Sequence, residues 1–312
     1  RRPVLIFDTY EALWRDRPAG GAISDLGGDN WLRRLAEEAK GCLFVIAGRR
    51  RIAWKDIDPT WAPWIVSLPL DALDEAAERQ VSPADAGRVA ELFAARIATR
   101  KPAAYLTKEA WLQGVPFYVD ERAIVPRSFI AELLADGSID PWLGEHTRRV
   151  LDLCTGNGSL AVLAALTYPD IEVDAADLSA TALEVAAINV TRHQLDDRVK
   201  LIESDGLAAL NGPYDLILCN PPYVNATSMD ALPAEYRAEP ELALAGGADG
   251  MDFIRRLLAD APARMSDAAV LVLEIGNERA HFEAAFPQLE VVWLATSAGE
   301  DQVLLIPRES LL

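Results

Sequence analysis

The sequence predicts an α/β protein whose larger part is a mostly parallel, doubly wound sheet. From about residue 149 to the end of the 312-residue chain, short apolar runs typical of buried strands alternate with helix-forming stretches. Polar or glycine-containing turns follow several of these runs, at the edge where open α/β sheets bind ligands. With 51% hydrophobic residues, a chain of this length can also bury a full core.

Six apolar runs are expected to be strands of this sheet. They lie at residues 150–153, 172–176, 200–202, 216–218, 270–273 and 303–306. The first run is followed by a helix-forming stretch at residues 160–166. Upstream, an amphipathic helix is predicted over residues 82–99, because apolar side chains recur there at helical spacing. Ser82 would be its N-cap and Pro83 its first helical residue.

The beginning of the chain has a pattern of its own. Apolar runs at residues 4–7 and 42–47 flank a helical pattern around residues 31–36, which predicts a strand, helix, strand unit. We therefore expect three parts. They are an N-terminal α/β segment at residues 1–67, a helical connector at residues 68–101 and the main domain at residues 102–312.

The charge balance limits the partners that the protein can have. The chain carries 30 basic and 48 acidic residues, which give a formal net charge of -18 at pH 7. Such a charge disfavours direct binding to the phosphate backbone of nucleic acids. It would favour a basic protein partner, although charge that only maintains solubility produces the same composition.

Neither a metal site nor a membrane segment is expected. Cys42, Cys154 and Cys219 are too few and too far apart for a disulfide framework or a metal-binding knuckle, and the three histidines lack ligand spacing. The apolar runs are much shorter than the about 20 residues of a membrane span, and no signal-peptide core follows the basic N-terminus. We therefore expect a cytoplasmic protein.

The tetrapeptide Asn220-Pro221-Pro222-Tyr223 is the most informative motif of the chain. It places a neutral amide, two rigid imino acids and an aromatic ring directly after the apolar run at residues 214–219. None of these groups is a strong acid, base or nucleophile, so the motif suits the holding of a planar amide or amine by hydrogen bonds. An Asx turn at Asn220 and a core position for Tyr223 are the structural alternative.

Turns after three other predicted strands indicate a nucleoside site. Gly156 and Gly158 allow a sharp turn and a close approach of the backbone to a ligand before a helix, although a purely structural turn also uses glycine. Asp177 follows the next strand, where a carboxylate can accept hydrogen bonds from ribose hydroxyls. Asp205 suits an adenine amino group. The spacing fits a nucleoside without a pyrophosphate better than a dinucleotide.

Together these motifs resemble class I S-adenosylmethionine-dependent methyltransferases, and in particular the glutamine methyltransferases that modify translation proteins. The resemblance is carried by residues 152–158, 177–183, 204–205, 220–223, 232–244, 246–252 and 274–276. Residues 104–111 and 117–128 resemble the ribosomal-protein type, whose target is a glutamine in the third protein of the large subunit. The release-factor type usually has proline and glutamate after the Pro-Arg pair, whereas Ser128 follows Arg127 here.

The resemblance implies a class I, seven-stranded, Rossmann-like methyltransferase sheet in residues 102–312, with S-adenosylmethionine as cofactor and a basic ribosomal protein as substrate. The implied cofactor-binding residues are Asp152, Thr155, Gly156, Gly158, Asp177, Leu178, Asp205 and Asn220. The implied substrate-binding residues are Asn220, Pro221, Pro222, Tyr223 and Arg127, of which Asn220, Pro221 and Tyr223 would be catalytic. A structural ion pair is the alternative for Arg127, and Glu235 and Glu239 are expected to be solvated surface charges.

Residues 1–67 do not match this family. They resemble the later half of a P-loop signalling ATPase, in which Asp8 would be the Walker B acid, but the chain contains no phosphate-binding loop. ATP hydrolysis by this chain alone is therefore not expected. Three alternatives to a ribosomal-protein substrate stay open on the sequence: a peptide-chain release factor, an amino group of adenine or cytosine in nucleic acid, and a nonenzymatic binding module.

Overall fold

The computed structural model describes residues 83–233 and 235–312. The predicted unit in residues 1–67, the ATPase-like features and the N-cap at Ser82 lie outside the described residues. The chain divides into two compact units, Arg1–Thr107 and Lys108–Leu312. The domain boundaries expected at residues 67 and 101 stay a prediction.

The described part of the first unit contains two helices. Helix α3 (Pro83–Thr99) begins at the proline, as the sequence predicts, because proline has the backbone angle of a first helical residue and needs no hydrogen-bond acceptor. A short helix α4 (Ala103–Thr107) follows and contains the buried side chain of Tyr105.

The second unit is built on a seven-stranded sheet with the strand order β5-β4-β3-β6-β7-β9-β8. Its strands are β3 (Arg149–Leu153), β4 (Glu172–Asp177), β5 (Val199–Glu203), β6 (Tyr214–Cys219), β7 (Met265–Glu274), β8 (Val292–Thr296) and β9 (Gly299–Pro307). Strands β3 to β7 pair in parallel, and β9 is antiparallel to both of its neighbours. All six predicted strands are present. The strand order reverses between β3 and β6, which is the switch point where such sheets bind ligands.

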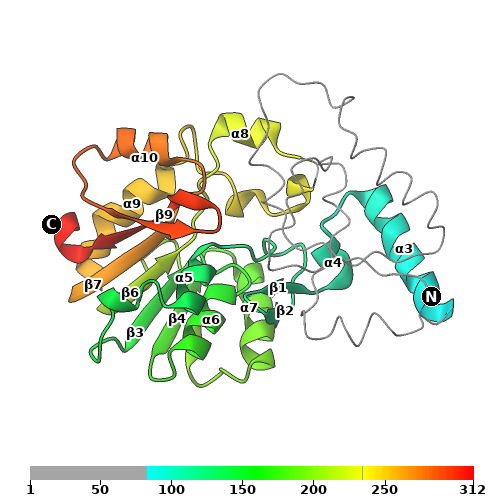
Figure 1. Ribbon diagram of the computed structural model, residues 1–312, viewed down its shortest axis with the longest axis horizontal. Helices are drawn as coiled ribbons and strands as arrows, with labels where there is room; N and C mark the ends of the chain where they lie inside the picture. The colour runs from blue at the N-terminus through cyan, green and yellow to red at the C-terminus, as the bar shows by residue number, and fades with distance from the viewer. Residues whose placement is uncertain (1–82, 234) are drawn as a thin grey trace. The chain divides into compact units, whose positions relative to one another are not determined.

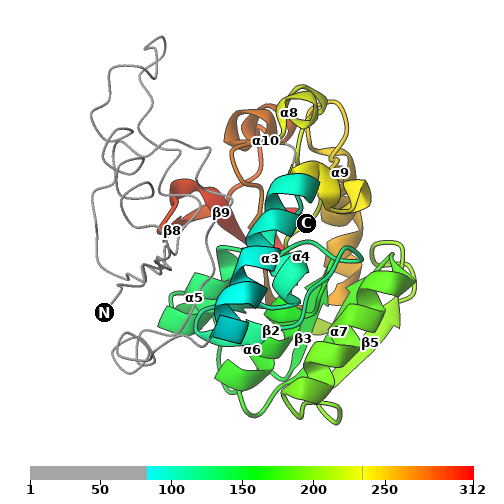
Figure 2. The ribbon, with the colours of Figure 1, turned by 90° about the vertical axis from the view of Figure 1, so that its right-hand side faces the viewer.

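Helices cover both faces of the sheet, as the doubly wound prediction requires (Figures 1 and 2). One face carries α5 (Ile130–Asp136), α6 (Ser159–Thr167) and α7 (Ala180–Arg192), and the other carries α9 (Asp252–Asp260) and α10 (Arg279–Ala285). Helix α8 (Ala226–Ala231) follows the turn after β6 and has no buried residue. Short 3-10 helices are η5 (Asp140–Trp142), η6 (Tyr236–Ala238), η7 (Glu241–Ala243), η8 (Ala261–Arg264) and η9 (Arg308–Leu311).

Successive residues of one strand enter two different cores, because side chains of a strand alternate between its faces. Val150 packs in a core with residues of α5, α6 and α7, whereas Leu151 packs in a second core with residues of α9 and α10. Helix α6 is buried over Ser159–Ala165 because it lies within the first core. A sheet covered on both faces leaves its carboxyl edge as the place for a site.

A small hairpin precedes the sheet and was not predicted. Strands β1 (Ala110–Leu112) and β2 (Val115–Phe117) pair antiparallel, and the two residues between them, Gln113 and Gly114, have φ angles of 50° and 76°. Two positive φ values are typical of the tight turn that suits the twist of a hairpin. Among the described residues, no helix is long and apolar enough to cross a membrane.

Candidate active site

A cleft lies at the carboxyl edge of the sheet, at the ends of β3, β4, β5 and β6. It encloses about 1080 Å³ of space not filled by protein atoms, part of which is open to solvent. Six of the predicted site residues line it, namely Gly156, Asp177, Leu178, Asp205, Asn220 and Pro222. The structure therefore brings together residues from four successive strand ends, as the motifs indicated.

The loop between β3 and α6 forms one side of the site. Gly156 and Gly158 have φ angles of 56° and 80°, which a residue with a Cβ adopts only under strain. A Cβ atom at Gly158 would lie 3.0 Å from the Cβ of Ala186 in α7, so glycine is needed there for close packing of α6 and α7 as well. Gly158 does not line the cleft, whereas Gly156 does.

Asp152 is a buried carboxylate at the end of β3. Its Oδ2 atom accepts hydrogen bonds from the hydroxyl of Thr155 and, at 2.9 Å, from the backbone N–H of Ala161. Burial raises the pKa of Asp152 to about 7, against the effect of these two donors. Within residues 83–233 and 235–312 its Oδ1 atom has no hydrogen-bond partner, which leaves an acceptor for a further donor.

Asp177 connects the first two loops of the site. Its Oδ2 atom accepts a hydrogen bond from the N–H of Gly156 at 2.8 Å, and its Oδ1 atom accepts one from the N–H of Ser179 at 2.9 Å. Burial raises the pKa of Asp177, and the backbone donors oppose this shift. The Leu178 N–H is a third backbone donor to this carboxylate. Because a carboxylate has about four lone-pair sites, Asp177 can still accept a hydrogen bond from a ligand. Leu178 next to it is 49% exposed.

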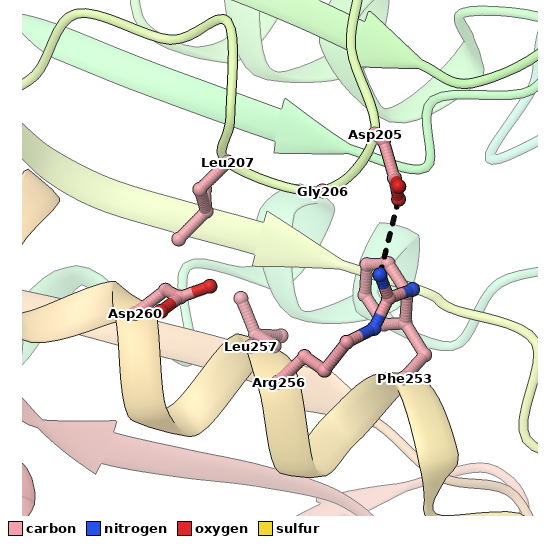
Figure 3. A pocket seen from close by; sticks show the side chains of 7 residues that line it. All are labelled: Asp205, Gly206, Leu207, Phe253, Arg256, Leu257 and Asp260. Carbon is pink, nitrogen blue, oxygen red and sulfur yellow. Dashed lines mark hydrogen bonds and ion pairs between the residues drawn. The ribbon is translucent and has the colours of Figure 1, made fainter.

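Asp205 lies on the loop after β5 and pairs with Arg256 of α9, at 3.3 Å between Oδ1 and Nη1 (Figure 3). Both side chains are more than half exposed, so the pair is weak and can be rearranged by a ligand. The guanidinium of Arg256 also lies over the ring of Phe253, 5.6 Å from its centroid. Phe253 and Arg256 line the cleft beside Asp205, although the sequence did not single them out.

The tetrapeptide after β6 is divided between the cleft and the core. Asn220 and Pro222 line the cleft, and the amide of Asn220 makes no hydrogen bond to any described residue. Pro221 is buried and does not line the cleft. Tyr223 packs against the second core, and its hydroxyl donates a hydrogen bond of 3.4 Å to Glu274. Asn220 is therefore the residue of this motif whose polar side chain lines the cleft.

Two glycines make room for Tyr223. A Cβ atom at Gly276 would lie 2.5 Å from the Tyr223 ring, and one at Gly250 would lie 2.2 Å from the Tyr223 carbonyl oxygen. No side chain fits at these distances, so the packing of the tyrosine requires glycine at both positions.

Arg127 does not line the cleft. Its Nη1 and Nη2 atoms donate to the two carboxylate oxygens of Glu239, both at 2.7 Å. The expectation that Glu239 is a solvated surface charge was wrong, because its side chain is only 3% exposed. A carboxylate buried to this extent requires a partner, and Arg127 supplies it. Glu235 is partly buried.

Glu274, at the end of β7, belongs to the residues that carry the resemblance, but no role in the site was predicted for it. This buried carboxylate accepts hydrogen bonds from the Ser128 hydroxyl at 2.6 Å and from the Phe129 N–H at 2.8 Å. The available signal was an acidic residue at the carboxyl end of an apolar strand. A further wall of the cleft comes from residues 240–247, for which the sequence predicted no site role although most of them carry the resemblance. It contains Pro240, Leu242, Ala243, Ala245, Gly246 and Gly247.

The site fits a nucleoside-type methyl donor. The turn at Gly156 lets the backbone approach a ligand, and Asp177 retains acceptors for hydroxyl groups. Asp152 has an unsatisfied oxygen at the start of the same loop, but Asp152 and Thr155 are buried and do not line the cleft. The described residues contain no group of His, Cys, Asp and Glu that could hold a metal ion.

A family model described as "Methyltransferase small domain" matches residues 133–235. With the seven-stranded sheet and the cleft at its switch point, this match defines a class I methyltransferase, a class that generally uses S-adenosylmethionine. Three curated relatives named ribosomal protein uL3 glutamine methyltransferase are 48–56% identical to the chain over more than three quarters of its length, so the chain belongs to that family. The predicted fold class, family and enzyme class are therefore confirmed.

Three curated relatives carry this assignment, and each is named ribosomal protein uL3 glutamine methyltransferase. The one from Bordetella pertussis is 56% identical over 78% of this chain and 83% of its own length. The one from Burkholderia pseudomallei is 54% identical over 77% of this chain and 81% of its own length. The one from Neisseria gonorrhoeae is 48% identical over 79% of this chain and 83% of its own length.

Proposed function

We propose that this protein transfers a methyl group from S-adenosylmethionine to the side-chain amide nitrogen of a glutamine in ribosomal protein uL3. The observation that carries the proposal is the unpaired amide of Asn220 at the cleft, directly beside the loops of a nucleoside site. The substrate named for the relatives supports the choice of uL3.

The cofactor would be held by the ends of β3, β4 and β5. Asp177 would accept hydrogen bonds from the ribose hydroxyls, since it lines the cleft and its backbone donors do not use all of the about four lone-pair sites of a carboxylate. Asp205 would accept a hydrogen bond from the adenine amino group after its exposed ion pair with Arg256 is broken or rearranged. Asp152, Thr155, Gly156, Gly158 and Leu178 complete the proposed cofactor site. The cofactor supplies an electrophilic methyl group on a sulfonium.

Asn220 and Pro221 would orient the amide of the substrate. A glutamine nitrogen is a poor nucleophile because its lone pair is delocalised into the carbonyl, so the site must aim that nitrogen at the methyl group. The side-chain oxygen of Asn220 and the backbone carbonyl of Pro221 would each accept one N–H. Pro222 stiffens the turn, and Tyr223 contributes a wall. No dedicated base is needed, because an N-methylated amide cation loses its proton readily to water.

The net charge of -18 would attract a basic ribosomal protein to this enzyme. The same charge argues against direct methylation of nucleic acid. A ribosomal-protein substrate would place the reaction in the cytoplasm.

Replacement of Asn220 by alanine tests the proposal. We expect Asn220→Ala to lower methyl transfer by about 100-fold or more, because the amide loses one of its two orienting acceptors. The affinity for S-adenosylmethionine, measured by calorimetry, should stay within a few-fold of the wild type. Asn211→Ala removes an exposed amide outside the cleft and is the matched control. Unchanged transfer by Asn220→Ala would exclude the role given to this residue.

Purified targets distinguish the substrates that the sequence left open. Ribosomal protein uL3, a peptide-chain release factor and DNA are each incubated with the enzyme and labelled cofactor, and the products are analysed by mass spectrometry. We expect one added methyl on a single glutamine of uL3. Label on another target would reassign the substrate, and no cofactor binding at millimolar concentration would favour a nonenzymatic binding module.

A further inference from the structure

Arg127 and Glu239 form a bidentate ion pair between two distant segments of the chain. The guanidinium uses both terminal nitrogens on the two carboxylate oxygens, and each of the two bonds is 2.7 Å long. The side chains of Arg127 and Glu239 are 27% and 3% exposed. The guanidinium also lies over the ring of Tyr236, 4.8 Å from its centroid. A planar two-pronged pair on an aromatic ring is rigid, unlike an exposed ion pair.

Glu239 is joined directly to one wall of the cleft. We define the wall segment as residues 240–247, since Pro240, Leu242, Ala243, Ala245, Gly246 and Gly247 line the cleft. The C-terminal end of the wall segment is hydrogen-bonded to Val224, which directly follows the tetrapeptide after β6. The Val224 N–H donates to the Leu244 carbonyl and the Gly246 N–H donates to the Val224 carbonyl, both at 2.9 Å. The N-terminal end of the segment begins beside Glu239, where the attachment is the pair with Arg127.

Ser128, the residue after Arg127, is linked to Tyr223 of the tetrapeptide through Glu274. Ser128 donates a hydrogen bond of 2.6 Å to Glu274, and Glu274 accepts from the hydroxyl of Tyr223. The segment before α5 is therefore connected to both ends of residues 223–239. Arg127 binds Glu239 at one end, and Ser128 is linked through Glu274 to Tyr223 at the other. This arrangement fixes the wall segment relative to the sheet and to Asn220.

We propose that Arg127 and Glu239 are positioning residues that hold the wall segment in place for the protein substrate, and that Arg127 does not itself bind substrate or cofactor. This inference rests on the proposed function only in naming the substrate. Arg127 lies outside the cleft lining, and its best-placed donors are already used by Glu239.

Hydrogen–deuterium exchange tests the attachment without any activity measurement. We expect Arg127→Met and Glu239→Leu each to speed amide exchange in the wall segment, while amide exchange in β3 and β6 stays unchanged. Arg279→Met is the matched control, because Arg279 also pairs with one carboxylate and lies over an aromatic ring, that of Trp293, but outside the cleft lining. Unchanged exchange in both single variants would overturn the proposal even if the enzyme methylates uL3 as proposed.

Steady-state kinetics separate positioning from direct binding and from simple misfolding. Each single variant should raise KM for the protein substrate about tenfold, with the cofactor affinity changed less than threefold. A loss of folded enzyme would lower the apparent kcat and leave KM unchanged, which would count against the proposal.

The double variant Arg127→Met/Glu239→Leu distinguishes a positioning role from a ligand contact. An apolar pair of similar volume can replace a buried ion pair, so the attachment should be restored without charge. We expect KM of the double variant to return to within about threefold of the wild type. A KM as high as that of Arg127→Met alone would show that the guanidinium acts on the substrate, and the proposal would be wrong.

Discussion

Glu274 shows how a single residue can connect the stability of this protein to pH. The carboxylate is 2% exposed, and burial raises its pKa from 4.5 to about 7 despite donors from Ser128, Phe129 and Tyr223. The protonated form is thus favoured in the folded protein. As the pH rises from 4.5 towards 7, the unfolded chain releases this proton first, so the free energy of unfolding decreases.

Glu274→Gln should remove this part of the pH dependence. Glutamine keeps an oxygen for the Ser128 and Phe129 donors and carries no charge, so ionisation no longer costs stability. Urea denaturation should show a loss of a few kcal/mol between about pH 5 and pH 8 in the wild type and a clearly smaller loss in the variant. Asp152, whose pKa is also raised to about 7, accounts for a remaining decrease in the same direction.

The exposed Glu309 supplies the control for this experiment. Glu309→Gln removes one carboxylate without altering a buried site, so the loss of stability between the two pH values should equal that of the wild type. Equal losses in Glu274→Gln and the wild type would show that the ionisation of Glu274 does not affect folding.

At the scale of elements, the packing of α6 on α7 depends on one glycine. Gly158 has a φ angle of 80°, and a Cβ atom there would lie 3.0 Å from the Cβ and 3.2 Å from the Cα of Ala186. The glycine therefore meets two requirements, one of backbone angle and one of space. They can be separated, because Gly114 in the hairpin turn has a φ angle of 76° and no atom within 4 Å of the position that a Cβ would occupy.

We expect Gly158→Ala to lower the free energy of unfolding by about 2–4 kcal/mol, and Gly114→Ala by about 1 kcal/mol. The difference measures the contact with α7, since both substitutions meet a similar backbone angle. Denaturant unfolding of both variants tests this. Equal losses of unfolding free energy would mean that α7 shifts to accommodate the added Cβ at no cost. Only the backbone angle would then require glycine at position 158.

The elements also show why some strands were predictable and others were not. Strands β3 and β6 are buried on both faces, so they are largely apolar in the sequence: β6 ends in the apolar run 216–219, and within residues 150–153 of β3 only Asp152 is polar. Strand β8 was missed because it lies at the edge of the sheet, and of its five residues only Leu294 is buried. The hairpin of β1 and β2 has three residues per strand, too few for a recognisable alternation.

At the scale of the whole molecule, the net charge of -18 governs encounters with other macromolecules. A field of this size would speed association with a basic protein and is screened by salt, with a Debye length of about 10 Å at 0.1 M. The charge has no comparable effect on a small neutral ligand.

Raising the salt concentration from about 50 mM to about 500 mM should therefore raise KM for ribosomal protein uL3 several-fold. Steady-state kinetics with the full protein substrate measure the effect. A short uncharged peptide that contains glutamine is the control substrate, and its KM should change little. The same salt dependence for both substrates would show that long-range attraction by this enzyme does not contribute to substrate binding.

Six of the seven strands, the family and the polar residues at the strand ends could be predicted from the sequence alone. Buried parallel strands are readable as apolar runs, and each of Gly156, Asp177, Asp205 and Asn220 lies within three residues of the end of such a run. The meeting of these residues in one cleft then follows from the parallel direction of the strands, because their carboxyl ends lie at a common edge.

Only the tertiary structure decided which charges are buried and what they hold. Glu239 looked like a surface charge, yet it pairs with Arg127, which is 112 residues away in the chain. Glu274 binds Ser128 across 146 residues. Such contacts have no local pattern in the sequence, because the environment of a charged side chain depends on which distant segments fold against it. For this reason the contacts that hold the cleft wall, Arg127 with Glu239 and Ser128 with Glu274, could be found only in the structure and not in the sequence motifs.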